Sequence, residues 1–232
     1  MGSIADNLQA VIGRIDKATA ASGRAPGEVC LLAVSKTWPV TSVSEAVAAG
    51  QKAFGEHYVQ EGIDKILALR AEGVSGLSWH FIGPLQSNKT RLVAEHFDWV
   101  HSIERLKIAE RLSAQRPPEF PPLNVCVQVN ISGEKSKSGC HPDEAMALAR
   151  AVSLLPGLRL RGVMAIPEPV ETLAGQREPL LRMKMLFDQI RKGGMAIDTL
   201  SMGMSHDLEA AVSAGATMVR IGTAIFGQRN QT

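Results

Sequence analysis

A lysine, Lys36, stands directly after the apolar run VCLLAVS at residues 29–35. A short run of this kind predicts a strand that is buried on both faces. A lysine amine that is partly desolvated by a neighbour such as Trp38 loses its proton readily and can attack a carbonyl to form a Schiff base. The alternative is a rim charge whose stem reaches water. The position alone allows both interpretations.

Two glycine-containing segments near the end of the chain could hold a phosphate. These are SMGMS at 201–205, which leads into a predicted helix, and RIGTAIFG at 220–227. Backbone N–H groups at the start of a helix, together with a serine hydroxyl, suit a phosphate group. An ordinary turn capped by Ser205 is the alternative for the first segment. A phosphorylated aldehyde would suit both segments and the lysine together.

Arg220 falls within the last predicted strand. A buried guanidinium requires a partner, which is either an interior carboxylate or a ligand atom. Because arginine cannot accept a proton, a guanidinium that faced a pyridine nitrogen would favour the unprotonated ring, which is a poor electron sink. Both kinds of partner remain open at this point.

Regular alternation of elements predicts the scaffold that positions these residues. Residues 4–20 place apolar side chains on one helical face, with Ser3 as the N-cap. Strand-like and helix-like segments then alternate to the end of the chain, with strands predicted near residues 30, 53, 80, 100, 126, 162, 200 and 220. Eight parallel strands with outer helices predict a single (β/α)8 barrel domain over residues 1–232. A doubly wound open sheet is the alternative, since periodicity does not reveal closure.

The barrel prediction itself selects candidate site residues. Active sites in such barrels lie at the carboxyl ends of the strands, and phosphate is often held by the loops after strands 7 and 8. The positions that follow or end the predicted strands are Lys36, Glu56, His57, Gly83, 130–132, 201–205 and 220–223.

The composition gives no support for nucleic-acid or membrane partners, because the charged fraction is 21% and the net charge is +2. No run approaches the roughly 18 apolar residues of a membrane span, and the opening MGSIADNLQA lacks a leader pattern. The three cysteines, Cys30, Cys126 and Cys140, have no paired close spacing. We expect a cytoplasmic protein with a small-molecule site and no metal site.

Several motifs together resemble one known family, that of the pyridoxal phosphate homeostasis proteins (YggS/PROSC), which look like the barrel domain of alanine racemase standing alone. The resemblance extends from about residue 5 to Gly227, and the motifs that carry it are LLAVSKTWP, FGEHYVQE, WHFIGPLQSNK, NISGEKSKSG, LRGVMAI, LSMGMSHD and VRIGTAIFG.

The resemblance implies pyridoxal 5′-phosphate as the cofactor. Lys36 would bind it as a Schiff base, and Arg220 would face the pyridine nitrogen. The phosphate would be held by Ser201 or Ser205 with backbone groups of Met204, Gly222 and Thr223. His57 stands where the family usually has asparagine, so it either stacks on or hydrogen-bonds to the ring or is a rim histidine.

The resemblance also implies a binding protein rather than an enzyme, one that limits free cofactor and delivers it to apo-enzymes, and we expect a monomer without catalytic residues. A racemase needs two acid/base groups, and beyond Lys36 the chain offers no obvious second one, its single tyrosine being Tyr58. A weak racemase using Tyr58 or His57, and a Schiff-base aldolase for a phosphorylated sugar, are the alternatives. The GEKSKSG loop at 133–139 is either a solvated connection or a lid whose Lys135 or Lys137 receives the cofactor.

Overall fold

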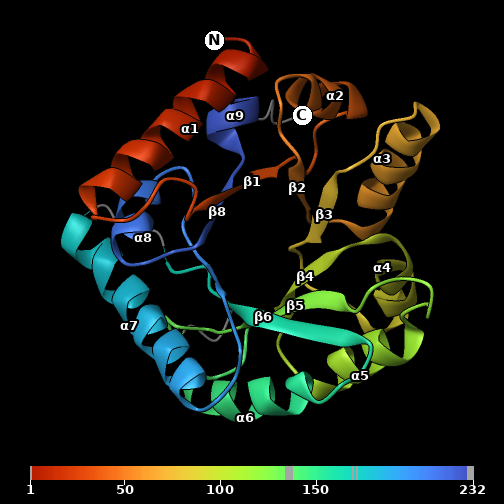
Figure 1. Ribbon diagram of the computed structural model, residues 1–232, viewed down its shortest axis with the longest axis vertical. Helices are drawn as coiled ribbons and strands as arrows, with labels where there is room; N and C mark the ends of the chain where they lie inside the picture. The colour runs from red at the N-terminus through yellow and green to blue at the C-terminus, as the bar shows by residue number, and fades with distance from the viewer. Residues whose placement is uncertain (1, 134–137, 169, 171, 229–232) are drawn as a thin grey trace.

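Eight parallel strands form a closed barrel in the computed structural model, which describes residues 2–133, 138–168, 170 and 172–228 (Figure 1). Each strand pairs with the next along the chain, and β8 pairs with β1 to close the ring. The strands are β1 Cys30–Val34, β2 Ala53–Glu56, β3 Ser78–Phe81, β4 Trp99–Ile103, β5 Leu123–Gln128, β6 Leu158–Met164, β7 Thr199–Ser201 and β8 Met218–Ile221. The predicted barrel is confirmed, and the open sheet is excluded.

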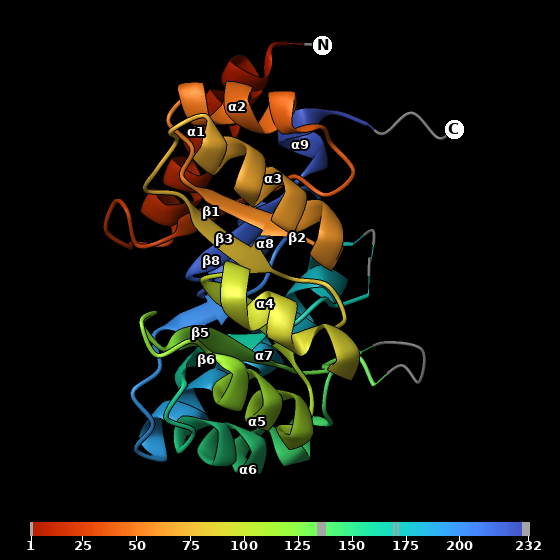
Figure 2. The ribbon, with the colours of Figure 1, turned by 90° about the vertical axis from the view of Figure 1, so that its right-hand side faces the viewer.

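Helices connect the strands on the outside of the ring (Figures 1 and 2). They are α1 Ile4–Ala21, α2 Val40–Ala48, α3 Val59–Ala71, α4 Thr90–His96, α5 Leu106–Gln115, α6 Pro142–Ser153, α7 Leu173–Lys192, α8 Leu208–Ser213 and α9 Thr223–Phe226, with a 3-10 turn η1 at Ser87–Lys89. Strand backbones that are covered by helices outside and by packed side chains inside need apolar residues on both faces. This is why β1 is a continuous apolar run and why β4 and β5 are mostly apolar, with two polar residues each.

The first helix, α1, packs against the last helices of the chain, α8 and α9. Ser3 caps it as predicted, in a capping box with Asp6. Its buried face, which includes Leu8, Val11 and Ile15, packs against the segments that carry α8 and α9. The start of the chain thus covers the last two βα units.

The inside of the barrel differs from the main core. Trp99, Cys126 and Met164 form a small apolar cluster of their own. Polar side chains share this interior, beginning with His80, whose ring stacks on Trp99 at a centroid distance of 5.0 Å. His101 lies tilted against the same tryptophan. The barrel axis therefore carries buried polar groups that must satisfy one another.

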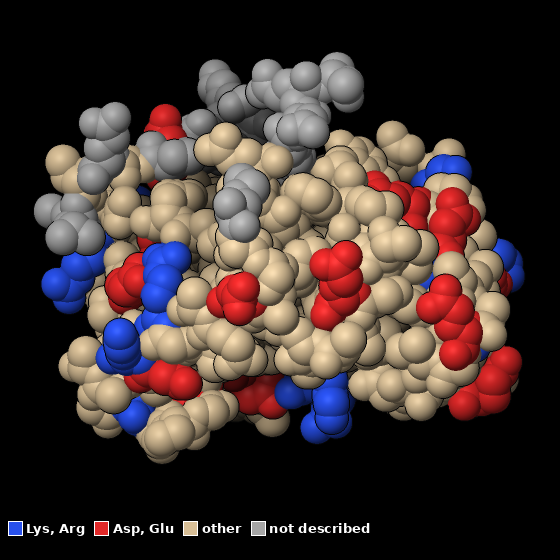
Figure 3. Space-filling view, turned by 90° about the horizontal axis from the view of Figure 1, so that it is seen from above, with Lys and Arg blue, Asp and Glu red and all other residues tan. Residues whose placement is uncertain are grey.

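The outer surface carries both signs of charge. On the face seen in Figure 3, acidic and basic side chains occur side by side, so neither sign covers it. Among the residues that the structure describes, no helix has the length and apolar character needed to cross a membrane.

Candidate functional site

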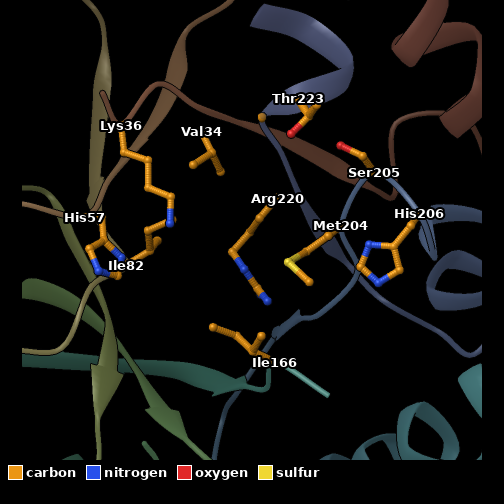
Figure 4. Close-up of a pocket in the computed structure, with 11 residues that line it drawn as sticks. Val34, Lys36, His57, Ile82, Ile166, Met204, Ser205, His206, Arg220 and Thr223 are labelled. Carbon is orange, nitrogen blue, oxygen red and sulfur yellow. The ribbon is translucent and has the colours of Figure 1, made fainter. Parts of the chain in front are cut away.

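A cavity of about 310 Å³ lies where the carboxyl ends of β1, β2, β3, β6, β7 and β8 converge (Figure 4). Its lining consists of Val34, Lys36, His57, Ile82, Ile166, Met204, Ser205, His206, Arg220, Gly222 and Thr223. Lys36 and Arg220 reach toward its centre from different walls (Figure 4). All of the residues predicted to bind the cofactor line this cavity except Ser201.

Lys36 follows Ser35 at the end of β1, and the backbone on each side of it is held by a charged side chain. The carbonyl of Ser35 accepts a hydrogen bond from Lys65 Nζ at 2.7 Å. The N–H of Thr37 donates to Glu61 Oε1 at 2.5 Å. Thr37 has a φ of 68°, a left-handed conformation that is unfavourable for a β-branched residue. These two contacts fix the strained turn from which Lys36 projects.

We call Ser35, Glu56, Glu61 and Lys65 the Lys65 network. Lys65 Nζ lies 2.7 Å from both Glu56 Oε1 and Glu61 Oε1. Glu56 is fully buried and Lys65 is 5% exposed. Burial raises the pKa of Glu56, while the charge of Lys65 opposes that rise. A buried ion pair of this kind depends on both partners, since either charge alone would be uncompensated.

Arg220 belongs to the neighbouring wall, in β8, which pairs directly with β1, and it is 4% exposed. It donates from Nη1 to Ser201 Oγ at 2.7 Å and from Nη2 to the carbonyl of Ala165 at 2.8 Å. Burial lowers the pKa of Arg220 to about 10, while the charge of the buried Asp207 opposes that fall, so Arg220 stays a cation near neutrality. In the described part of the chain no carboxylate forms an ion pair with it. The interior ion pair considered for this arginine is therefore not found among the described residues, and a ligand partner stays a prediction.

The predicted phosphate segments meet at the edge of the cavity. Ser205, in the loop before α8, and Thr223, at the start of α9, lie close together there (Figure 4). The hydroxyl of Ser205 accepts from the N–H of Ala224 at 3.4 Å. A Cβ on Gly222 would lie 3.1 Å from the carbonyl oxygen of Val34, which explains the glycine where β8 passes against β1.

Two details of the first segment differ from the expectations. Met204 contributes its side chain to the cavity, but its N–H already donates to Asp207 Oδ1 at 2.6 Å and is not available to a phosphate. Helix α8 begins at Leu208 with Asp207 as its N-cap, so Ser205 does not cap it. Both observations leave the side chains of Ser205 and His206 as the polar groups that this loop contributes to the cavity.

Ser201 has no place on the cavity surface. It is fully buried inside the barrel, where its hydroxyl contacts Arg220 and His101 Nδ1, the latter at 3.0 Å. Of the two serines considered for the phosphate, Ser205 alone lines the cavity, and its role there stays a prediction. His101 and its contact with Ser201 were not anticipated, because the two residues are 100 positions apart in the sequence.

His57 lines the cavity beside Ile82 (Figure 4). Its ring meets the ring of Tyr58 edge-on at a centroid distance of 4.8 Å. A Cβ on Gly83 would lie 2.1 Å from the carbonyl oxygen of His57, so only glycine permits this close approach. Tyr58 is 54% exposed and does not line the cavity. Of the two groups considered as a second base, His57 alone lines this cavity.

Several lining residues were not expected from the sequence. His206 lines the side opposite His57 (Figure 4). The apolar walls are Val34, Ile82 and Ile166. Ile82 follows directly after β3, and Ile166 follows β6 by two positions. Extending the strand-end rule to apolar residues would have identified both.

Helix α1 braces the phosphate side of the site from outside. Asn7 Nδ2 donates to the carbonyl of Ile225 in α9 at 2.9 Å. Arg14 Nη2 donates to the carbonyl of Ser205 at 3.2 Å and also pairs with Glu209. The two backbone segments that border the predicted phosphate position are thus tied to the same helix. The hypothesis concerning Lys135 and Lys137 falls outside the described residues.

The fold and this site define a barrel of the alanine racemase type, and the family model for the N-terminal domain of alanine racemase matches residues 7–230. Curated relatives cover almost the whole chain. A pyridoxal phosphate homeostasis protein of Escherichia coli strain K12 is 58% identical over 230 residues, which span 99% of this chain and 98% of that protein. One from Pseudomonas aeruginosa is also 58% identical, spanning 99% and 97%. The chain therefore belongs to the family of pyridoxal phosphate homeostasis proteins.

Solved structures agree with this placement. PipY of Synechococcus elongatus PCC7942, solved with PLP bound, is 34% identical, with a TM-score of 0.82 over 97% of this chain and all of that one. A protein described as unknown from Bifidobacterium adolescentis is 33% identical, with a TM-score of 0.88 over 96% and 94%. Alanine racemase of Clostridium difficile 630 is 15% identical, with a TM-score of 0.77 over 97% of this chain and 58% of that chain, a likeness of fold alone.

Proposed function

We propose that this protein binds pyridoxal 5′-phosphate through Lys36 and acts in the homeostasis of vitamin B6. The observation that carries the proposal is the pairing of Lys36 with a buried arginine, Arg220, across one cavity. A buried cation without a carboxylate partner in the described residues indicates a site built for an anionic or acceptor ligand. The names of the relatives and the PLP-bound PipY structure support the same ligand.

The cavity suits this ligand in size and in chemistry. Its volume of about 310 Å³ is at the lower end of the roughly 300–1,000 Å³ that is usual for small-molecule sites. The cofactor supplies an aldehyde, which a lysine amine binds reversibly as a Schiff base with loss of one water. Lys36 would provide that amine. The hydroxyls of Ser205 and Thr223, with the backbone at Gly222, would hold the phosphate.

Arg220 decides what kind of chemistry the site favours. Its guanidinium can only donate hydrogen bonds, so beside a pyridine nitrogen it keeps that nitrogen unprotonated. An unprotonated ring withdraws electrons poorly, which disfavours reactions that pass through a carbanion. This residue therefore fits a protein that stores the cofactor better than one that uses it.

The proposal includes the absence of catalysis at this site. Racemisation needs a second acid/base group near Lys36, and the histidines that line the cavity, His57 and His206, are the candidates there. The racemase alternative therefore predicts exchange of the Cα proton of an amino acid with solvent deuterium. A panel of amino acids incubated with the loaded protein in D2O tests it, and the proposal expects no exchange above that of free cofactor.

Binding itself is tested by absorption spectroscopy with borohydride trapping. The wild-type protein is expected to take up added pyridoxal 5′-phosphate with a visible band, and reduction should leave an adduct that mass spectrometry maps to Lys36. Lys36→Ala should lose both signals. Lys52→Ala, which removes an exposed lysine before β2, is the matched control and should keep them. A protein that cannot be loaded, or an adduct only on a sugar phosphate, would refute the proposal, the second result favouring an aldolase.

We also propose that the protein works as a cytoplasmic monomer that passes its cofactor to apo-enzymes. The cysteines Cys30, Cys126 and Cys140 are all free thiols, and burial raises the pKa of Cys126 to about 12 and that of Cys140 to about 11. Free thiols are compatible with a reducing compartment. Light scattering tests the monomer. Reactivation of an apo-aminotransferase tests the transfer: the loaded protein should reactivate it faster than free cofactor at the same concentration does.

A further inference from the structure

A line of hydrogen-bonded polar side chains crosses the barrel interior and ends at Arg220. We call Ser78, His80, His101 and Ser201 the interior chain. Ser78 Oγ lies 3.0 Å from His80 Nε2, His80 Nδ1 lies 2.9 Å from His101 Nε2, and His101 Nδ1 lies 3.0 Å from Ser201 Oγ. Arg220 Nη1 joins the end of the line at Ser201. The contributing strands are β3, β4, β7 and β8.

The hydrogen bonds of the interior chain satisfy every buried donor if each residue donates to the next, from Arg220 toward Ser78. Arg220 can only donate, so Ser201 Oγ accepts from it. The hydroxyl hydrogen of Ser201 then needs an acceptor, and Nδ1 of His101 is the other polar atom in contact with it within the described residues. The opposite direction would leave that hydrogen buried and unpaired, which costs free energy.

This direction fixes the protonation of both imidazoles. His101 accepts at Nδ1, so its proton is on Nε2 and is donated to Nδ1 of His80. His80 in turn carries its proton on Nε2 and donates to Ser78. A charged imidazole could not accept at Nδ1, so both rings must be neutral.

The surroundings favour the neutral rings. His80 is 2% exposed and His101 is fully buried. Burial, reinforced by the charge of Arg161, lowers the pKa of His80 to about 3. Burial, reinforced by His80 and then Arg220, lowers the pKa of His101 well below its ordinary value. The stacked indole of Trp99 adds no competing polar contact on the face of His80.

We propose that the interior chain is a positioning device that holds the guanidinium of Arg220 in one orientation toward the cavity. Ser201 anchors Nη1, and the carbonyl of Ala165 anchors Nη2. A carboxylate would hold the arginine more strongly but would also neutralise it. Neutral groups fix the orientation and leave the charge available to a ligand. The part of this proposal that concerns the ring nitrogen rests on the proposed cofactor function.

The first test does not depend on the cofactor. In protein labelled with 15N-histidine, His80 and His101 are expected to show an unprotonated Nδ1 and a protonated Nε2, without change between about pH 6 and 8. The two residues are assigned by the signals lost in His80→Gln and His101→Gln. A proton on Nδ1 of His101, or a charged ring at either position, would overturn the proposed direction of the chain.

The second test measures the effect on the site with a matched pair of serine variants. Ser201→Ala removes the acceptor of Arg220. Ser102→Ala, in β4, removes another buried hydroxyl, one that has no hydrogen-bond partner in the structure. We expect Ser201→Ala to weaken the binding of pyridoxal 5′-phosphate about tenfold and to shift the absorption maximum of the bound cofactor. The control should keep the wild-type affinity and maximum.

A third comparison separates orientation from packing. His101→Leu cannot continue the chain, whereas the amide of His101→Gln supplies one acceptor and one donor. The leucine variant should reproduce the spectral shift, and the glutamine variant should restore the wild-type maximum. Equal spectra in Ser201→Ala, His101→Leu and wild type would overturn the positioning role. A wild type that binds no cofactor would instead refute the proposed function, while the NMR test would still decide the direction of the chain.

Discussion

Lys36 and Arg220 face the same cavity from neighbouring strands, β1 and β8, but the groups that hold them differ in charge. The turn at Lys36 is held by ionised side chains, Lys65 and Glu61, which bind its backbone. Arg220 is held at its own side chain by the hydroxyl of Ser201 and the carbonyl of Ala165. The imidazoles of His101 and His80 lie behind the hydroxyl.

The roles that we propose for the two residues account for the difference. A lysine that reacts through its amine needs a fixed backbone and an available side chain. Charged side chains can therefore bind the backbone of the turn around it without binding the amine. An arginine that binds a ligand through its charge would have that charge neutralised by a carboxylate partner. The two walls thus show two ways of fixing a cation-bearing residue, and variants in each wall should have different consequences.

The largest effect is expected in the Lys65 network. Lys65→Met leaves Glu56 and Glu61 without their cation, and breaking a buried ion pair of this kind lowers the free energy of unfolding by about 3–5 kcal/mol. Urea denaturation followed by circular dichroism measures it. The double variant Lys65→Met/Glu56→Gln, which also removes the uncompensated buried charge, should recover part of the loss. A loss below about 1 kcal/mol would mean that the network behaves as an exposed pair.

A smaller and different effect is expected at Arg220. Arg220→Met removes a buried cation that has no carboxylate partner in the described residues, so the unfolding free energy of the free protein should fall less than in Lys65→Met. The affinity for pyridoxal 5′-phosphate should fall about 10- to 100-fold, the usual range for a lost hydrogen bond to a charged group. Fluorescence titration checks the affinity. Unchanged binding would remove the arginine from the site.

The phosphate side of the Arg220 wall can be tested separately. Ser205→Ala should weaken the binding of pyridoxal 5′-phosphate about tenfold and leave the binding of pyridoxal, which has no phosphate, as it was. Equilibrium dialysis with both compounds gives the comparison. Ser213→Ala, a serine that bonds within its own helix, serves as the control. Equal losses for the two compounds would contradict a phosphate role for this hydroxyl.

The smallest effect is expected at the brace from α1. Asn7→Ala removes the hydrogen bond to Ile225 and should lower the free energy of unfolding by about 1 kcal/mol. Because the described side-chain hydrogen bonds of Asn7 reach α9 and Gly2 but not the Lys36 turn, the rate of borohydride-trapped adduct formation at saturating cofactor should stay unchanged. A slower rate would show that the two walls are coupled through the first helix.

Much of this architecture could be predicted from local pattern. The apolar runs locate the eight strands, Ser3 marks the start of α1, and the strand-end rule brings Lys36, Ser205 and Arg220 together, because a parallel barrel collects its strand ends at one mouth. The segment 220–227 was only partly anticipated. Its strand stops at Ile221 and α9 begins at Thr223. A short apolar run does not distinguish a strand from a helix, so this boundary could not be predicted.

The missed features depend on long-range contacts. Lys65 occurs in a helix, where a lysine ordinarily faces water, and its burial depends on Glu56 from another element. Ser201 and Ser205 look equivalent in the sequence, and only the side-chain direction at the end of β7 separates them. The pairing of His101 with Ser201 required closure of the barrel.

The packing of α1 against α8 and α9 has a consequence for how the protein folds during its synthesis. The first helix emerges from the ribosome long before β8, its partner segments and Arg220, and β1 has no partner on one edge until β8 is made. Contacts between the two ends of a chain form late in folding. The cavity can therefore be completed only after nearly the whole chain has been translated, and a nascent or truncated chain would expose one edge of β1 and lack the arginine wall.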